Sequence, residues 1–332
     1  MTIDHSIEQL PGSQFNRNDL IQQGLLYNVA NPSSAGPIAS VAVTVPGSYA
    51  TLPTFGTSGA GSGATLVGHM GALTASLATA GTGYVATEAV TLTGGTAATN
   101  AVMTVTNIKL VSLAINAGGS GYAVGDTIVL NGGTHSVSAV VTVLSLSTTA
   151  VATFSITTAG VYTTGATTFT QASTSGSGTG ATFQTGVFGI NAFTVSTAGS
   201  YTVLPSNPVS QGSTTGSGTG ATFTINTWKI GTVTVSAGGT LYNSASALTV
   251  TGGGSTGGGA GTLTLTNTGI SVTVPVTTLT TLPPNYAVNV TPSQACFISV
   301  NTKTSNSFNV VLKPITSSDV ITAGTFDVTV LG

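Results

Sequence analysis

The pattern of apolar and polar positions along most of this chain has a period of two. Runs such as Ala152–Ile156 and Thr232–Val235 alternate β-branched or aromatic residues with small polar ones. Such alternation is typical of a β-strand that buries one face. Glycine-rich turns separate the runs, and Asn131-Gly132 between the runs Asp126–Leu130 and Val137–Val143 predicts a hairpin. The pattern therefore predicts an all-β protein.

A unit of about 39 residues recurs six times between residues 39 and 270. Its marker is a glycine-containing turn followed by tyrosine, and successive tyrosines lie 35, 38, 40, 39 and 41 residues apart. The chain has only 8 tyrosines, so composition does not explain this spacing. One unit is too small to bury an apolar face alone, so we expect the units to pack on one another. The tyrosines expected to carry this packing are Tyr49, Tyr84, Tyr122, Tyr162, Tyr201 and Tyr242.

A second marker strengthens the repeat. The segment Gly176–Phe183 recurs as Gly216–Phe223, with a weaker echo at Gly61–Leu66. Each unit is expected to hold three or four short strands. The pattern leaves open whether the six units stack as a solenoid, close as blades within one chain, or interleave between chains.

The two ends of the chain differ from the repeats. Residues 1–38 form an N-terminal arm and linker, in which Asn16–Tyr27 predicts either a short helix or an extended arm. Residues 271–332 contain alternating runs around a turn-rich connector at Asn301–Ser307, and predict a small C-terminal β-sandwich. Met1–His5 lacks the start of a secretory signal, so we expect synthesis in a cytoplasm.

Charge is nearly absent from this chain. Only 5 basic and 7 acidic residues occur among 332, or 4%, against about 25% in an ordinary soluble domain. Five basic residues are too few to neutralise the phosphates that give nucleic-acid binding its affinity. No apolar run reaches the roughly 18 residues of a membrane-spanning helix. We therefore expect no nucleic-acid partner, no membrane segment, and a hydroxyl-rich structural protein whose neutral strand edges are covered by subunit pairing.

Ionisable side chains form no recognisable catalytic or metal-binding motif. His5, His69 and His135 lie in different parts of the chain without metal-ligand spacing. Glu88 and Asp126 each follow a repeat tyrosine by four residues. A glycosidase pair would need these carboxylates within about 5–10 Å, and we interpret them instead as polar residues at the start of strands. We expect no catalytic residue, no cofactor, no metal and no enzymatic activity.

Three further features have a structural interpretation. The glycine-rich segment Gly176–Phe183 leads into a β pattern and lacks the lysine of a phosphate-binding loop. Trp228 is expected to pack between units, with stacking on a saccharide as the alternative. Cys296, the only cysteine, is expected to be a small buried apolar residue.

The repeat segment Gly118–Leu130, with its Gly-Gly-Ser-Gly-Tyr turn, resembles repeats in structural proteins of tailed bacteriophages, especially head decoration (cement) proteins and tail fibres. The runs Tyr286–Val290, Phe297–Val300 and Gly324–Val328 are similar to a small β-sandwich common at the ends of phage surface proteins. The resemblance implies a homotrimer, the major capsid protein as partner, and a place on the capsid surface of the virion.

We therefore expect a capsid cement protein that bridges capsomers and stabilises the phage head. Its N-terminal arm would grip the shell through apolar anchors, namely Leu20, Ile21, Leu25, Leu26 and Tyr27. The alternative is a trimeric tail fibre or spike that binds a host surface glycan through its C-terminal β-sandwich. A third interpretation is a wall-associated bacterial adhesin or a six-bladed propeller enzyme.

Overall fold

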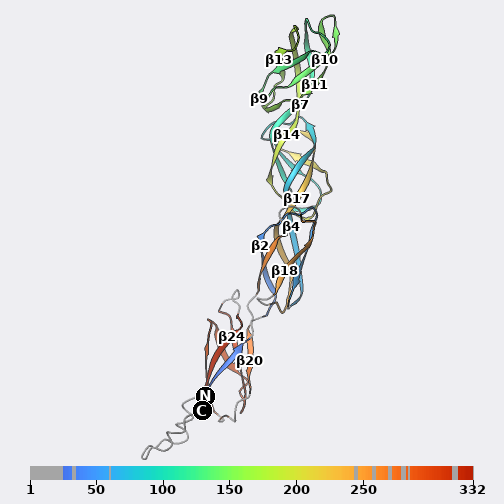
Figure 1. Ribbon diagram of the computed structural model, residues 1–332. Helices are drawn as coiled ribbons and strands as arrows, with labels where there is room; N and C mark the ends of the chain where they lie inside the picture. The colour runs from blue at the N-terminus through green and yellow to red at the C-terminus, as the bar shows by residue number, and fades with distance from the viewer. Residues whose placement is uncertain are drawn as a thin grey trace, which may run out of the picture.

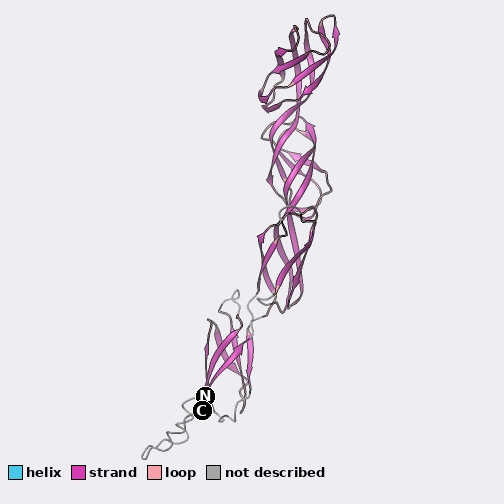
Figure 2. Ribbon diagram, viewed as in Figure 1, coloured by secondary structure: helices cyan, strands magenta, loops and turns pink. Residues whose placement is uncertain are grey.

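The computed structural model confirms the all-β prediction, since every regular element of the described residues is a strand (Figure 2). The structure describes residues 25–31, 35–59, 61–242, 246–255, 259–267, 271–277, 282, 285–315 and 321–331. The chain forms an elongated rod of four lobes in series (Figure 1). We call them the base lobe (25–31 and 271–331), the lower lobe (36–69 and 230–267), the middle lobe (70–109 and 188–229) and the upper lobe (110–187). The last three together are the shaft.

The shaft is one nested hairpin, in which the chain runs out to the tip and returns beside itself. Two pairs of long antiparallel strands carry it from lobe to lobe. Strand β4 (Ser62–Thr82) pairs with β17 (Thr219–Thr240), and β7 (Val102–Ser120) pairs with β14 (Thr179–Thr197). The six units therefore do not follow one another along the rod. Each lobe of the shaft combines one outgoing and one returning unit, which is neither a solenoid nor a ring of blades.

Shorter strands complete each lobe of the shaft. The lower lobe pairs β2 (Ile38–Val45) with β19 (Thr262–Asn267), and β3 (Pro53–Ser58) with β18 (Ala247–Gly252). The middle lobe pairs β5 (Ala89–Leu92) with β16 (Val209–Thr214), and β6 (Thr96–Thr99) with β15 (Ser200–Val203). The upper lobe contains β8 (Thr127–Asn131), β9 (Thr134–Val137), β10 (Val140–Ser147), β11 (Ala150–Thr158), β12 (Val161–Thr164) and β13 (Thr168–Thr174). Strands β10 and β11 close the hairpin through the turn at Thr148-Thr149.

The hairpin predicted at Asn131-Gly132 is not a tight two-residue turn. Strand β8 pairs with β10, but β9 lies in the connection between them and pairs instead with β12. The Tyr162 hydroxyl also accepts a hydrogen bond from the backbone N–H of Ala139 at 3.0 Å, which holds the end of this connection near β12. A long-range contact thus replaces the local turn.

The base lobe has two three-stranded sheets around one apolar core. One sheet has the order β1 (Leu25–Asn31), β24 (Gly324–Leu331), β21 (Ala287–Pro292), and the other the order β20 (Val272–Val276), β23 (Phe308–Lys313), β22 (Phe297–Asn301). The helical alternative for Asn16–Tyr27 is wrong for its last three residues, because they form part of β1. Pairing with β24 fixes their backbone as a strand. Leu20 and Ile21 lie outside the described residues.

Candidate interaction sites

The six repeat tyrosines are buried and fall into two kinds of site, one of each in every shaft lobe. In the first kind, the hydroxyl accepts the backbone N–H of the alanine in a Gly-Xaa-Gly-Ala segment. The acceptor and donor pairs are Tyr84 with Ala221 (3.3 Å), Tyr122 with Ala181 (3.2 Å) and Tyr242 with Ala64 (3.3 Å). A Cβ on the first glycine of each segment would overlap the tyrosine ring. The glycines of the second sequence marker therefore leave the space in which these three tyrosine rings pack.

In the second kind of site, the tyrosine follows a glycine by two residues, and a Cβ on that glycine would again meet the ring. Its hydroxyl accepts a backbone N–H from across the lobe: Tyr201 from Ala101 (2.8 Å), Tyr162 from Ala139 (3.0 Å) and Tyr49 from Gly261. These tyrosines lie where adjacent lobes join. Tyr201 pairs with Met70 on β4, and Tyr49 forms a β-bridge with Trp228 on β17. Tyr201 and Tyr49 therefore occupy equivalent places on the two paired long strands.

Burial dominates the ionisation of these side chains. It raises the pKa of Tyr84, Tyr122, Tyr162 and Tyr201, because the charged phenolate would lose its hydration. The hydrogen bond from a backbone N–H lowers each pKa in part, and the carboxylates of Glu88 and Asp126 add a smaller increase for the first two residues. All four hydroxyls are therefore neutral structural groups at neutral pH.

Glu88 and Asp126 lie in different lobes and each holds the loop that follows a tyrosine. The Glu88 carboxylate is 3% exposed and accepts hydrogen bonds from Val85 N (3.0 Å), Gly218 N (3.0 Å) and the Thr214 hydroxyl. Asp126 Oδ2 accepts Ala123 N at 2.8 Å. Both carboxylates are engaged in their own lobes, so they do not form the paired site of a glycosidase.

The other polar candidates also have local partners. His69 lies within 3.3 and 3.4 Å of the hydroxyls of Ser200 and Thr234, and His135 Nε2 lies 2.9 Å from the Ser138 hydroxyl. The part of the chain that the structure describes contains no group of three or more His, Cys, Asp or Glu residues able to hold a metal ion.

Trp228 occupies the junction of the lower and middle lobes and is 2% exposed. It exchanges backbone hydrogen bonds of 2.7 and 2.8 Å with Tyr49. Its ring meets Tyr201 edge to face at 5.4 Å between ring centres. The expected packing between units is confirmed, and the side chain is not available to stack on a saccharide.

The upper lobe carries an open groove between two strand edges. The second half of β7 runs beside β11, and two hydrogen bonds join the chain at either end of this shared stretch, Leu110 N to Ala159 O (2.9 Å) and Tyr122 N to Thr149 O (3.0 Å). Between these ends, the described residues show no ladder pairing of β7 with β11. The two strands therefore bow apart and leave unpaired backbone edges on either side of a gap.

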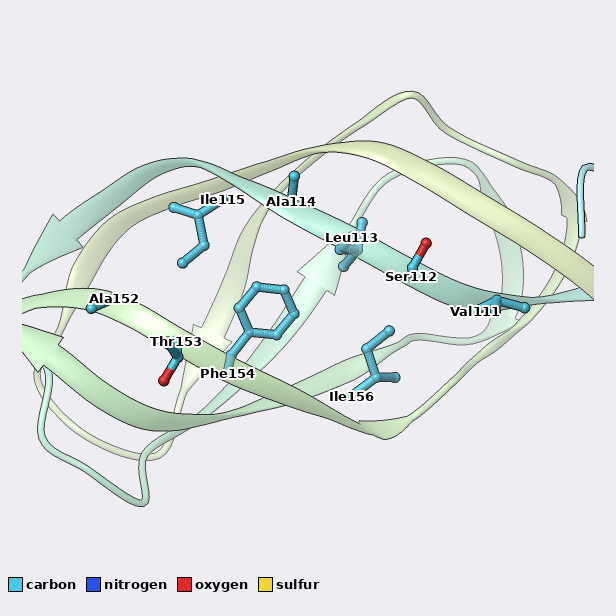
Figure 3. A pocket seen from close by; sticks show the side chains of 9 residues that line it. All are labelled: Val111, Ser112, Leu113, Ala114, Ile115, Ala152, Thr153, Phe154 and Ile156. Carbon is cyan, nitrogen blue, oxygen red and sulfur yellow. The ribbon is translucent and has the colours of Figure 1, made fainter.

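Apolar side chains line this groove (Figure 3). Leu113 and Ile115 extend from β7, and Phe154 and Ile156 from β11, toward the space between the strands. The cavity has a volume of about 660 Å³, and none of its lining residues is charged. Phe154 also packs edge to face on the buried Phe183, with 5.1 Å between ring centres, which fixes one wall of the groove to the core.

Sequence reasoning missed the groove. The alternation in Ala152–Ile156 predicted a half-buried strand, but nothing in that pattern indicated that Val111–Ile115 would face it without pairing. Of the proposed capsid anchors, Leu25, Leu26 and Tyr27 lie in β1 opposite Val330, Thr329 and Val328. Their contact with a capsid stays a prediction.

The described residues include no helix with the length and hydropathy needed to cross a membrane. Comparisons with protein-family models, with curated proteins and with solved structures gave no match.

Proposed function

We propose that this protein is a structural projection on the surface of a tailed-bacteriophage virion, attached to the capsid through its base lobe. It acts as a homotrimeric decoration protein whose base stabilises contacts between capsomers and whose shaft extends outward. This role requires neither catalysis nor a cofactor. The Glu88 and Asp126 carboxylates agree with it, because both accept hydrogen bonds from the backbone of their own loops.

One observation carries this proposal. Both ends of the described chain lie in the base lobe, while the tip of the rod is formed by the middle of the sequence (Figure 1). The two ends of the described chain, Leu25 and Leu331, therefore lie together in the lobe opposite the tip. A protein attached through that lobe presents its upper lobe away from the attachment surface.

The distribution of charge fits an external rod. Within the described residues of the shaft, the charged side chains are Glu88, Lys109, Asp126 and Lys229, and Glu88 is buried. A hydroxyl-covered surface with so little charge changes little with external salt or pH. This supports a place on a particle that meets variable conditions.

Copy number in purified virions tests the proposal. We expect hundreds of copies at a fixed ratio to the major capsid protein, measured by quantitative mass spectrometry. Removal of residues 1–24, which leaves strand β1 in place, should abolish binding to capsids that lack the protein, while a matched substitution at the tip, Leu144→Ser, should leave binding intact. Absence from virions, or undiminished binding of the truncated chain, would contradict the proposal.

A tail fibre or spike is the second candidate, and the groove favours it. The groove lies in the lobe farthest from both ends of the chain, where a receptor-binding site would stand. The hollow in the base lobe, lined by residues such as Ser293 and Asp327, has only about 110 Å³. Under this alternative we place host binding on the upper lobe rather than on residues 271–332.

The two candidates separate in a binding assay with host cells. A fibre should occur in a handful to a few dozen copies per virion, and the purified chain should bind host cells and lose binding in the groove variant Val111→Lys. Binding that depends instead on residues 271–332, tested on a glycan array, would support the C-terminal site expected from the sequence.

A further inference from the structure

The outgoing chain crosses the middle lobe three times. It rises in β4, descends through β5 and β6, and rises again in β7. At the lower end of the lobe, Tyr201 pairs with Met70 of β4, and its hydroxyl accepts the N–H of Ala101, directly before β7. At the upper end, Phe188 pairs with β7 and accepts the N–H of Tyr84, which follows β4. Strand β4 and the first half of β7 therefore span the same length of the rod.

The returning chain takes the same path in reverse. It descends in β14, climbs back through β15 and β16, and descends again in β17. Thr214 of β16 lies opposite Val90 of β5, and Gln211 lies opposite Leu92, so a climbing strand pairs with a descending one. Because both chains turn back twice within the lobe, the lobe stores far more chain than its own length requires.

A pull along the rod enters and leaves the middle lobe on different strands. The β4–β17 pair continues into the lower lobe, whereas the β7–β14 pair continues into the upper lobe (Figure 1). Neither pair runs through all three lobes of the shaft. Tension between the tip and the base must therefore pass from one pair to the other inside the middle lobe.

Strands β5 and β16 link the two pairs. The order of strands in the sheet is β14-β7-β5-β16-β17-β4, so the ladder between the pairs passes through both of them. Ala89–Thr91 of β5 pair with Val102–Thr104 of β7, and Val209–Ser210 of β16 pair with Thr222–Phe223 of β17. On the other side of the lobe, the described residues show no ladder between β4 and β14.

The direction of these strands decides how the link responds to force. Hydrogen bonds of an antiparallel ladder lie perpendicular to their strands. A lengthwise pull slides the strands past each other and strains all the bonds of the link together, whereas a pull across the rod separates strand pairs one after another. The buried side chains of Val90, Met103 and Phe223 lie on the linked strands, so their packing must break in the same event.

We propose that the shaft is a load-bearing tether in which β5 and β16 form a shear clamp that carries tension across the middle lobe. Below its limit, the clamp keeps the rod at a fixed length. Above it, the lobe opens as a unit and each chain straightens from three crossings to one, so the rod lengthens by a set amount. This mechanical function belongs to the shaft itself and applies to a decoration protein and to a fibre alike.

The repeat length sets the size of each step. Tyrosines of the returning chain lie 39 and 41 residues apart, which is the chain held by one lobe. Extended chain spans at most about 3.6 Å per residue, and one crossing of a lobe takes up about 40 Å of it, so each opening should release about 100 Å. The upper and lower lobes store the returning chain in the same way, through β13 between β11 and β14, and through β18 between β17 and β19.

Single-molecule pulling on the full chain tests the tether. Handles at Thr149→Cys in the turn of the tip and at Thr266→Cys at the foot of the shaft, in a Cys296→Ser background, load the returning chain along the rod. We expect three steps of about 100 Å each, one for every lobe of the shaft. Gradual lengthening without discrete steps would overturn the proposal.

The direction of the pull supplies the matched control. Thr266 lies opposite Ser40 on the paired strand β2, so handles at Ser40→Cys and Thr266→Cys, attached after reduction, pull the same lobes apart across the rod. We expect this crosswise pull to open the shaft at a lower force than the lengthwise pull, because it loads the strand pairs one at a time. Equal opening forces in the two directions would show that the lobes do not act as shear clamps.

Discussion

The hydroxyl of Tyr84 accepts a hydrogen bond of 3.3 Å from the backbone N–H of Ala221, which lies 137 residues later in the chain. In the next lobe Tyr122 makes the same bond to Ala181 at 3.2 Å, across only 59 residues. The identical contact at two such different separations is what a nested hairpin requires. Each tyrosine ties an outgoing unit to the returning unit beside it.

Removal of one tyrosine hydroxyl should destabilise the middle lobe. Tyr84→Phe leaves the N–H of Ala221 without a partner and also removes the hydrogen bond that the hydroxyl donates to Gln211. The expected loss is about 1–3 kcal/mol of unfolding free energy, measured by denaturant titration. As a control, Tyr286→Phe removes hydroxyl bonds to Thr304 O and Ser307 O in the base lobe, and should leave the shaft transition unchanged.

Replacement of the buried carboxylate should also destabilise the middle lobe. In Glu88→Gln one carboxylate oxygen becomes an N–H₂ donor that faces a donor already present, such as Val85 N or Gly218 N. We expect a loss of about 1–3 kcal/mol, because a buried donor is left unpaired. The matched change Asp126→Asn affects a more exposed carboxylate and should lower the unfolding free energy by less. Equal effects of the two changes in thermal unfolding would contradict the role assigned to burial.

Alkaline pH should weaken the shaft. Burial raises the pKa of Tyr84, Tyr122, Tyr162 and Tyr201 in the folded state. In the unfolded state a tyrosine has its ordinary pKa of about 10. Above that pH the unfolded state binds fewer protons than the folded state, so stability falls as pH rises toward the folded-state pKa. Absorbance at the tyrosinate band, followed with circular dichroism, should show ionisation of these residues only as the protein unfolds.

The nested arrangement predicts that the rod can be shortened by a paired deletion. Removing 85–122 together with 163–201 joins equivalent positions in the outgoing and returning units. The former tip strands should then cap the middle lobe. We expect a folded rod that is one lobe shorter by small-angle scattering. Removal of 85–122 alone leaves a returning unit without its outgoing partner, so this control should unfold or aggregate.

The local pattern of apolar and polar residues is sufficient to predict that the chain forms strands. Alternation of apolar and polar residues has the period of a strand, and a tyrosine every 35 to 41 residues marks a repeated environment whatever the order of the lobes. The Gly-Xaa-Gly-Ala marker was also readable, although its reason, space for a tyrosine ring from another unit, was not. The same alternation predicts a strand at Phe297–Val300, where the structure has β22.

Tertiary structure decided which units meet. Alternation shows that one face of a strand is buried, but it does not identify the partner strand, and β4 pairs with β17 from the far end of the repeat region. The same limit hid the groove, since Leu113 and Phe154 face each other across strands that do not pair. Leu241, Gly83 and Gly121 directly precede Tyr242, Tyr84 and Tyr122 and all have a positive φ, a backbone conformation that only the folded turn imposes.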